Sequence, residues 1–277
     1  GIMELQFVKV SPNENMTLLI ESPVPRSQHL AVAKALIAYG SVYAEQAGYI
    51  EEPENKAACA RLQMMAGEFC GNATLSLGAY LFSKEHPQTG AEKNFLLEVS
   101  GADSLIDCHM KKEADGYLGQ LSMPMPAKIA TETYMLDGIS YELETVYLPG
   151  ITHIIVPKAL WGEKAREKAE QAVTAWENQI AEEAFGILLF DETEMTLEPL
   201  VCVKNASLVW ERGCGSGTTA LGAALATKKQ DSLSLGLKQP GGVMYIDADW
   251  KDGCLHSLTL TVRVKIAAAG TAYLESF

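Results

Sequence analysis

The stretch EFCGNATLSLGAYLF, from Glu68 to Phe82, has a near copy in ERGCGSGTTALGAALA, from Glu211 to Ala226. Both place a cysteine directly before a glycine, then a small polar residue, then an apolar run of helical character. With Cys70 aligned on Cys214, seven of twelve positions are identical, and the two cysteines are 144 residues apart in a chain of 277. Chance similarity between two helices rich in small residues is one explanation. An internal duplication is the more economical one, and it predicts two similar domains that each present the same helix start.

The start of each repeat is typical of a helix N-terminus. Short polar side chains, here Asn72 and Thr74 in one copy and Ser216 and Thr218 in the other, commonly satisfy the N–H groups of a first turn. Glycine lets the backbone approach a ligand, and the positive end of a helix binds carboxylate or phosphate. The same field favours the reactive thiolate form of a cysteine. Two such elements describe one anion held by two helix ends, with a thiol on either side of it.

Two thiols on opposite sides of one anion fit the stereoinversion of an amino acid. One thiolate removes the α-proton and the other thiol delivers a proton to the opposite face, so we expect Cys70 and Cys214 to be catalytic. Preorganised N–H donors would stabilise the carboxylate of the developing carbanion. The chain shows no pyridoxal phosphate motif and no metal-site spacing of cysteines, so we expect neither a cofactor nor a metal.

Three other functions would use the same residues. A Cys–His hydrolase would need a histidine to activate one of the cysteines. A redox protein would join Cys70 and Cys214 in a disulfide, and a non-catalytic module would only bind an amino acid. Incorporation of deuterium at the α-carbon separates these alternatives from stereoinversion, because none of the three would show it.

Composition limits the class of partner. The net charge of −13 argues against a nucleic-acid surface, which depends on Lys and Arg, and fits a small-molecule ligand. No stretch has the roughly 20 consecutive apolar residues that cross a bilayer. The start of the chain, GIMELQFVKV, lacks the pattern of a secretory signal, so a cytoplasmic protein is expected. The remaining cysteines are expected to be small buried hydrophobes: Cys59, Cys108, Cys202 and Cys254.

Strand-like text dominates the chain and long helices are few, which predicts an α+β architecture. Nine apolar, β-branched runs read as strands: 5–10, 16–21, 95–100, 118–123, 152–157, 186–190, 197–204, 243–250 and 257–266. Residues 27–40 predict a helix with Leu30, Ala33, Leu36 and Ile37 on one face, ending at Gly40. Residues 163–181 predict a second helix, with a buried stripe at Ala165, Ala169, Val173, Trp176 and Ile180. Pro124 and Pro126, near the middle, suggest a linker.

With these motifs in place, the chain resembles the diaminopimelate epimerase superfamily of cofactor-independent, two-cysteine racemases over nearly its whole length. The motifs appear in the family's order: SPNENM, AEQAGYI, CGNA, GITH, WERGCGSGT and PGG. The resemblance implies two pseudo-symmetric α+β domains, each a sheet wrapped around a central helix. It implies one domain at 1–123 plus 265–277, a second at 124–264, an active site in the cleft between them, and a homodimer.

Departures from the epimerases bear on the substrate. Glu211-Arg212-Gly213 abuts Cys214, so a longer loop typical of the epimerases is missing. The asparagines with which the epimerases hold the distal end of diaminopimelate are absent, with Met64 and Met65 near one such place and Phe185 near another. The chain most resembles the histidine racemases of staphylopine-type metallophore synthesis, which makes histidine the expected substrate. Diaminopimelate, or another amino acid on the same scaffold, is the alternative.

The resemblance also implies roles for individual residues. The backbone N–H groups of Gly71, Asn72, Gly215 and Ser216 are expected to bind the α-carboxylate, with Gly217 beside them. Glu45 is expected to pair with the substrate's amino group or imidazole, or else to be a solvated carboxylate. Glu211 is expected to contact the substrate amine or to pair with Arg212. The remaining residues are expected to line the pocket, or to be structural polar groups: Asn15, Gln46 and His153.

Overall fold

The chain divides into two compact units, seen in a computed structural model that describes residues 1–275. Unit 1 comprises Gly1–Ser122 and the chain from Thr261 onward, and unit 2 comprises Met123–Leu260. Pro124 and Pro126 lie in the short segment that leads from the last strand of Gly1–Ser122 to the first strand of unit 2. The expected last strand extends to Phe277, and Ser276 and Phe277 lie outside the described residues.

Both units consist mainly of strands, and each expected strand is present. Unit 1 contains β1 (Ile2–Pro12), β2 (Thr17–Ile20), a 3-10 turn (Arg26–Gln28), α1 (His29–Ile37), β3 (Gln46–Glu51), β4 (Ala60–Met64), α2 (Gly71–Ser83), β5 (Glu92–Val99), β6 (Ile106–Glu113) and β7 (Gly116–Ser122). Unit 2 contains β8 (Lys128–Leu136), β9 (Ile139–Leu148), β10 (Ile151–Pro157), α3 (Ala165–Trp176), β11 (Ala184–Asp191), β12 (Thr196–Val203), β13 (Ser207–Trp210), α4 (Gly215–Lys229), β14 (Leu233–Gln239) and β15 (Gly242–Lys251). Three further 3-10 turns flank α3: Lys158–Leu160, Gly162–Lys164 and Glu177–Gln179. The last strand, β16 (Cys254–Glu275), begins in unit 2, belongs to unit 1 from Thr261 onward, and pairs antiparallel with β1 from Val264 to Glu275.

The two units repeat one topology, as the duplicated sequence predicts. In unit 1 the parallel pairs β2–β3 and β4–β5 are joined across α1 and α2. In unit 2 the parallel pairs β10–β11 and β12–β14 are joined across α3 and α4. Parallel neighbours require a crossover, and a helix is the usual one. Antiparallel pairs stand beside these, among them β1–β2, β3–β4 and β5–β6 in unit 1 and β9–β10, β11–β12 and β14–β15 in unit 2, so each unit is a mixed sheet of the α+β class.

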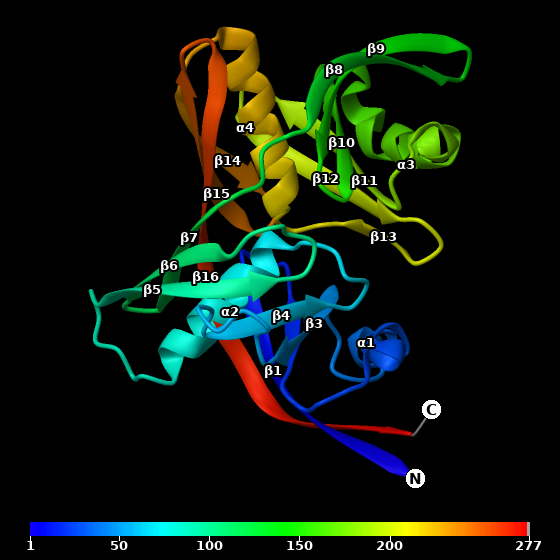
Figure 1. Cartoon of the computed structure of the whole chain (residues 1–277). Coiled ribbons are helices and arrows are strands. Elements are labelled where there is room, and N and C mark those ends of the chain that lie inside the picture. Colours follow the sequence, from blue (N-terminus) through cyan, green and yellow to red (C-terminus); the bar gives the residue numbers. More distant parts are fainter. Residues whose placement is uncertain (276–277) are drawn as a thin grey trace. The chain divides into compact units, whose positions relative to one another are not determined.

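The helix of each Cys-Gly repeat is the central helix of its unit. Helix α2 contacts β1, β2, β5, β6 and β7, and α4 contacts β9, β10, β14 and β15 (Figure 1). A Cβ added at Gly78 would lie 2.7 Å from the Sγ of Cys108, and one added at Gly222 would lie 2.8 Å from the Cγ1 of Ile246. These glycines occupy equivalent positions in the two repeats. The Leu-Gly-Ala sequence that both repeats contain therefore reflects the close approach between a buried helix and its sheet. None of the helices in residues 1–275 has the length and apolar character needed to cross a membrane.

Two outer helices cover the sheets, and the sequence predicted most of the buried face of each. In α3 the expected residues are buried, although the helix ends at Trp176 and Ile180 lies beyond it in an extended conformation. In α1 Ala33 and Leu36 are buried and Ile37 is partly buried, as expected, whereas Leu30 is 44% exposed and His29 and Val32 are buried in its place. The His29 ring stacks on Tyr49 at 3.6 Å and bonds the carbonyl of Val24, which turns this face of the helix toward the sheet. The helix also ends at Ile37, before Gly40.

Two of the four cysteines expected in the core are exposed instead. Cys108 and Cys202 are buried, as predicted, while Cys59 and Cys254 are exposed. Cys59 lies in the turn that precedes β4, and Cys254 begins β16 directly after the turn from β15. Apolar neighbours in the sequence misled the prediction, because turn positions at strand ends face solvent whatever the strand buries.

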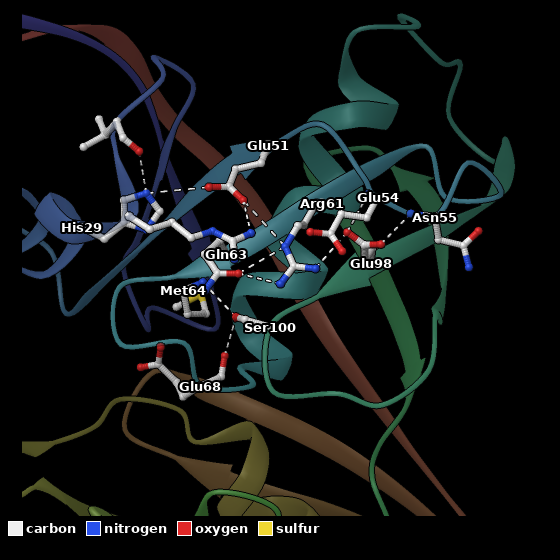
Figure 2. A network of polar contacts seen from close by, with 12 residues as sticks. His29, Glu51, Glu54, Asn55, Arg61, Gln63, Met64, Glu68, Glu98 and Ser100 are labelled. Carbon is white, nitrogen blue, oxygen red and sulfur yellow. Dashed lines mark hydrogen bonds and ion pairs between the residues drawn. The ribbon is translucent and has the colours of Figure 1, made fainter.

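A polar network joins the parallel strands β4 and β5 at the surface of unit 1 (Figure 2). The guanidinium of Arg61 on β4 bonds the carboxylate of Glu98 on β5 at 2.8 Å. The same carboxylate accepts the backbone N–H groups of Glu54 and Asn55, at 3.1 and 2.9 Å. These bonds lower the pKa of Glu98 to about 2, the Arg61 bond being the largest cause. One carboxylate thus fixes both a strand pair and the loop that precedes β4.

Replacing Gly78 by alanine should destabilise the protein. Overpacking typically costs about 1–3 kcal/mol, and the gain in helix propensity from glycine to alanine returns at most about 1 kcal/mol. Urea unfolding should therefore show a lower free energy of unfolding for Gly78→Ala than for the wild type. In a Cys108→Ala background, where the clashing sulfur is absent, Gly78→Ala should lower the free energy of unfolding by less than it does in the wild type. A Gly78→Ala protein as stable as the wild type would refute close packing as the reason for the glycine.

The Glu98 network should make stability depend on pH. Because the folded-state pKa of Glu98 lies below the usual value of 4.5, its contribution is present above about pH 4.5 and declines as pH falls toward 2. Glu98→Gln should therefore be less stable than the wild type at pH 7, and the difference should shrink at pH 3.5. Urea unfolding at both pH values measures this, with the exposed Glu52→Gln as control. A difference that stays constant with pH would mean that the ionised carboxylate is not responsible.

Candidate active site

The sulfur of Cys70 caps the N-terminus of α2. Cys70 has an extended backbone (φ −136°, ψ 110°), and its Sγ accepts the N–H of Ala73 at 3.4 Å. Its carbonyl accepts both the N–H and the hydroxyl of Thr74, at 3.0 and 2.8 Å. The thiol therefore sits at the positive end of a buried helix.

The sulfur of Cys214 caps α4 in the same way. Cys214 is also extended (φ −111°, ψ 109°), and its Sγ accepts the N–H of Gly217 at 3.2 Å. Its carbonyl accepts the N–H and the hydroxyl of Thr218, at 3.0 and 2.7 Å. The two repeats thus share their geometry as well as their sequence.

The caps differ from the sequence prediction in one respect. Short polar side chains were expected to satisfy the first-turn N–H groups, and the cysteine sulfurs do so instead. The side chain of Asn72 bonds Asn15, in the segment between β1 and β2, and that of Ser216 bonds His153 on β10, while the threonines donate to the cysteine carbonyls. An extended residue before a helix places its own side chain over the first turn, and here that residue is cysteine.

The segment that leads into Cys70 is held in place by Ser100 and Gly101, which begin the loop after β5. The Ser100 hydroxyl accepts the N–H of Met64 at 2.9 Å and donates to the carbonyl of Glu68 at 2.7 Å (Figure 2). Gly101 has φ +75°, and a Cβ there would lie 2.4 Å from the backbone nitrogen of Phe69. Only glycine fits this contact, which holds the chain directly before the thiol.

Asn15 is the centre of the polar groups around Cys70. It follows a tight turn in which Asn13 and Glu14 both have positive φ, 52° and 63°, and its N–H bonds the carbonyl of Pro12. This is the type I′ geometry of two-residue hairpins. The Asn15 amide donates to the Glu45 carboxylate, and its Oδ1 accepts from Asn72 at 2.9 Å. The SPNENM motif is therefore a turn that presents Asn15 to the helix start.

Gln46 connects Asn15 to the thiol. It is the first residue of β3 and pairs with Thr17 of the parallel strand β2. Its Nε2 donates to Asn15 Oδ1 at 2.8 Å and to Thr17 Oγ1 at 2.9 Å, and its Oε1 accepts from the Cys70 thiol at 3.4 Å. The structure thus brings together all the site residues expected in unit 1. We name them, with Thr17, the Cys70 cluster: Asn15, Thr17, Glu45, Gln46, Cys70, Gly71 and Asn72.

His153 approaches Cys214 through a serine. It lies on β10 and is fully buried, and its Nε2 is 2.8 Å from the Ser216 Oγ, which is 3.6 Å from the Cys214 Sγ. Burial lowers the pKa of His153 to about 3, so the ring is neutral at physiological pH. Its Nδ1 has no hydrogen-bond partner among the described residues.

Gly186 is a site residue that the sequence reasoning missed. It pairs with His153 in the parallel register of β10 and β11, and a Cβ there would lie 2.3 Å from the His153 Nδ1. Gly217 has a similar packing role, because a Cβ there would lie 2.9 Å from Leu188 on β11 and 3.1 Å from the Cys214 sulfur. Glycine at these positions makes room for the imidazole and for the thiol cap.

Gln239 is a second missed residue. Its Oε1 accepts the N–H of Cys214 at 2.9 Å, and its Nε2 donates to Thr218 at 2.7 Å. The following PGG segment bonds the residues before the cysteine, since the Gly241 N–H donates to the Arg212 carbonyl at 2.7 Å. The PGG motif, which directly follows Gln239, was a usable signal for it. We name the set in unit 2 the Cys214 cluster: His153, Gly186, Cys214, Gly215, Ser216, Gly217 and Gln239.

The other residues expected at the site lie in or next to the segments already described. Glu211 is half-buried at the end of β13, and its N–H bonds the carbonyl of Pro199. Gly71 and Gly215 are the first residues of their helices, where N–H groups have no intrahelical acceptor. Phe185 is fully buried in the core against α3. Within residues 1–275, no cluster of three or more His, Cys, Asp or Glu side chains could hold a metal ion.

Comparison with known proteins places these observations in a family. The family model described as the histidine racemase CntK N-terminal domain matches residues 4–273. The chain is 27% identical to a histidine racemase of Staphylococcus aureus strain Mu50 over 274 residues, covering 98% of each chain. It is 29% identical to a histidine racemase of Fusobacterium nucleatum subsp. nucleatum over 278 residues, covering 99% of this chain and 98% of the relative.

A solved structure shares the fold. The hydroxyproline epimerase of Agrobacterium vitis, crystallised with bound trans-4-hydroxy-L-proline, aligns with a TM-score of 0.69 at 14% identity, covering 99% of this chain and 92% of that one. At that identity the likeness speaks for the two-domain α+β fold alone. The full-length match of sequence and family model is the stronger finding, and by it this chain belongs to the histidine racemase family.

Proposed function

We propose that the protein interconverts L- and D-histidine without a cofactor, using Cys70 and Cys214 as its two acid–base groups. The observation that carries the proposal is the pair of thiol-capped helices, one in each repeat of a chain that belongs to the histidine racemase family. A hydrolase would use a single activated thiol, and would leave the second cap without a function. Stereoinversion uses both.

The reaction needs one thiol on each face of the substrate's α-carbon, and we propose that the two units provide them. One thiolate takes the α-proton and becomes a thiol. The other thiol gives its proton to the opposite face of the carbanion and becomes a thiolate. The number of protons is conserved, and the configuration at the α-carbon is inverted. General acid–base groups of this kind contribute about 10²- to 10⁴-fold each to the rate.

The helix starts supply the electrostatic stabilisation in this proposal. The first-turn N–H groups of Gly71 and Asn72 in α2, and of Gly215 and Ser216 in α4, would bind the α-carboxylate. The carboxylate takes on negative charge as the α-proton leaves, so donors that are already oriented lower the barrier. Both helices are buried and fixed by close packing, which holds the donors in place.

Glu45 is the proposed partner of a cationic group of the substrate. Its carboxylate is held by the Asn15 amide within the Cys70 cluster, so it is fixed near the thiol rather than free in solvent. The α-ammonium and the imidazole of histidine are both candidates for it. Glu211, directly before the Cys214 turn, is proposed to contact the α-ammonium. His153 donates into the Cys214 cluster in this scheme and does not bind substrate.

We further propose that the protein is a cytoplasmic homodimer. The dimer rests on the family resemblance. The cytoplasmic location rests on the acidic composition, with a net charge of −13, and on the small-molecule substrate.

Replacing either catalytic cysteine by serine should abolish racemisation. A serine hydroxyl is a far weaker acid than a thiol, so each variant should lose at least about 10²-fold in rate. Circular dichroism of L- or D-histidine turnover measures it, and Cys59→Ser, at an exposed position, serves as control. Residual activity of ten per cent or more of wild type, on the order of a single-digit-fold loss, would sink the two-base mechanism.

The substrate can be identified by exchange in D₂O. Incubation with L-histidine should replace the α-proton by deuterium, which proton NMR detects as loss of the α-signal. A panel of other L-amino acids and diaminopimelate is run in parallel. If diaminopimelate exchanges and histidine does not, the substrate assignment is wrong. If nothing exchanges, stereoinversion is refuted and the three alternatives, a hydrolase, a redox protein or an amino-acid-binding module, are left.

A further inference from the structure

Each thiol caps its own helix in the same way, but the two thiols differ in a further hydrogen-bond partner. Cys70 Sγ is 3.4 Å from the amide oxygen of Gln46, and Cys214 Sγ is 3.6 Å from the hydroxyl of Ser216. An amide oxygen only accepts hydrogen bonds, while a hydroxyl can donate one. The difference bears on which of the two sulfurs holds the proton.

The orientation of the Gln46 amide is fixed by a chain of contacts that begins at a carboxylate. Glu45 only accepts when ionised, so Asn15 must turn its Nδ2 toward Glu45 and its Oδ1 toward Gln46 and Asn72. Gln46 must then turn its Nε2 toward Asn15, where Thr17 also accepts from it. Its Oε1 is left facing Cys70.

This chain favours the protonated form of Cys70. Each bond polarises the next, and the negative charge of Glu45 makes the Gln46 oxygen a better acceptor. A thiol can donate to that oxygen at 3.4 Å, whereas a thiolate would face it as one acceptor against another. The contact is stabilising with the proton on sulfur and repulsive without it.

The groups around Cys214 favour the opposite state. His153 is neutral, so one ring nitrogen carries a hydrogen and the other a lone pair. Its Nδ1 lies against Gly186 with no acceptor among the described residues, and a buried N–H without an acceptor is rarely tolerated. The hydrogen therefore belongs on Nε2, which donates to the Ser216 oxygen at 2.8 Å.

Ser216 passes this donation on to the sulfur. With its oxygen occupied as an acceptor of the His153 N–H, its own hydrogen is directed to the Cys214 Sγ. The N–H of Gly217 donates to the same sulfur at 3.2 Å, as the Ala73 N–H does to Cys70 at 3.4 Å, so it is the Ser216 hydroxyl that distinguishes the two thiols. Both contacts are strongest with a negative sulfur, because hydrogen bonds to ionised acceptors are roughly twice as strong as neutral ones.

We propose that in the enzyme without substrate Cys214 is the thiolate and Cys70 holds the proton, and that Gln46 and Ser216 are the positioning residues that set this assignment. Its catalytic meaning rests on the proposed function. Substrate bound with its α-hydrogen toward Cys214 reacts directly with the resting form. The opposite enantiomer requires the proton to move first from Cys70 to Cys214, through solvent, so the two directions start from different protonation states of one enzyme.

Alkylation of the full-length, reduced enzyme with iodoacetamide tests the assignment, because only the thiolate reacts appreciably. The rate at each cysteine is followed by peptide mass spectrometry from pH 5 to 10. Each profile is scaled to its own plateau, which removes differences in accessibility. The midpoint for Cys214 should lie below that for Cys70 by about one pH unit or more, a tenfold or larger difference in thiolate fraction at a pH below both midpoints.

Two variants assign the effect to the named residues. Ser216→Ala should raise the midpoint of Cys214 and leave that of Cys70 unchanged. Gln46→Leu, which removes the acceptor, should lower the midpoint of Cys70. Thr219→Val is the matched control, since it removes a hydroxyl of the same helix that bonds only the Gly215 carbonyl, at 2.8 Å. Ser216→Thr, which keeps the hydroxyl, should restore the wild-type midpoint.

The outcomes separate this proposal from the proposed function. Equal midpoints, a reversed order, or a Cys214 midpoint unaffected by Ser216→Ala would overturn the proton assignment, even if histidine exchanges its α-proton in D₂O. The expected midpoints without any exchange of histidine would support the assignment, and would contradict only the racemase function.

Discussion

A cysteine sulfur serves as the N-cap of a buried helix in each half of the molecule, so the place of each thiol depends on how its helix is held. In the proposed mechanism the group that caps the helix and the group that reacts are the same atom, so the position of the helix sets the position of the thiol. A cap contributes only about 1 kcal/mol, too little to hold a buried helix by itself. The holding is done by packing: glycines at equivalent positions bring each helix against its sheet, and buried polar bonds from Ser100 and Gln239 fix the backbone around each cysteine.

The repeated topology explains how both thiols receive polar support from the same kind of place. In each unit the outer helix connects a pair of parallel strands, and one end of that pair lies beside the central helix. In unit 1 the pair presents Thr17 and Gln46, and in unit 2 it presents His153 and Gly186. Duplication therefore provided two equivalent positions, and substitution at those positions gave each thiol a different chemical environment without changing the scaffold.

The sequence predicted nine of the strands, the helix of residues 163–181 and the two cysteine elements, because these depend on local pattern. Shorter or more polar strands such as β3, β4, β8, β9, β13 and β14 carried no such pattern. The sequence also could not predict that His29 joins the buried face of α1, since the contacts that bury it, with Tyr49 and Val24, come from other segments. Nor could it assign the caps to the sulfurs, because threonine and asparagine are the commoner capping residues. Gly186 and Gln239 were missed because their roles come from contacts between distant parts of the chain. Gly186 faces His153 through strand register, and Gln239 contacts Cys214, 25 residues away, so the PGG motif could mark the place but not the contact.

An inverting enzyme with two bases cannot be fully symmetric in its proton content. It holds one exchangeable proton for two sulfurs, so at any moment one of them is a thiol and the other a thiolate. Identical environments would populate both arrangements equally, and only half of the molecules would be ready for a given enantiomer. Two different partners, an amide oxygen that requires a proton and a hydroxyl that supplies one, remove this degeneracy. Among the positions at which the repeats differ, Asn72 and Ser216 support the two sulfurs through different partners, Asn15 and His153, and Gln46 contacts only the Cys70 side. Divergence at these positions is what a duplicated scaffold needs before it can run a reaction that distinguishes its two faces.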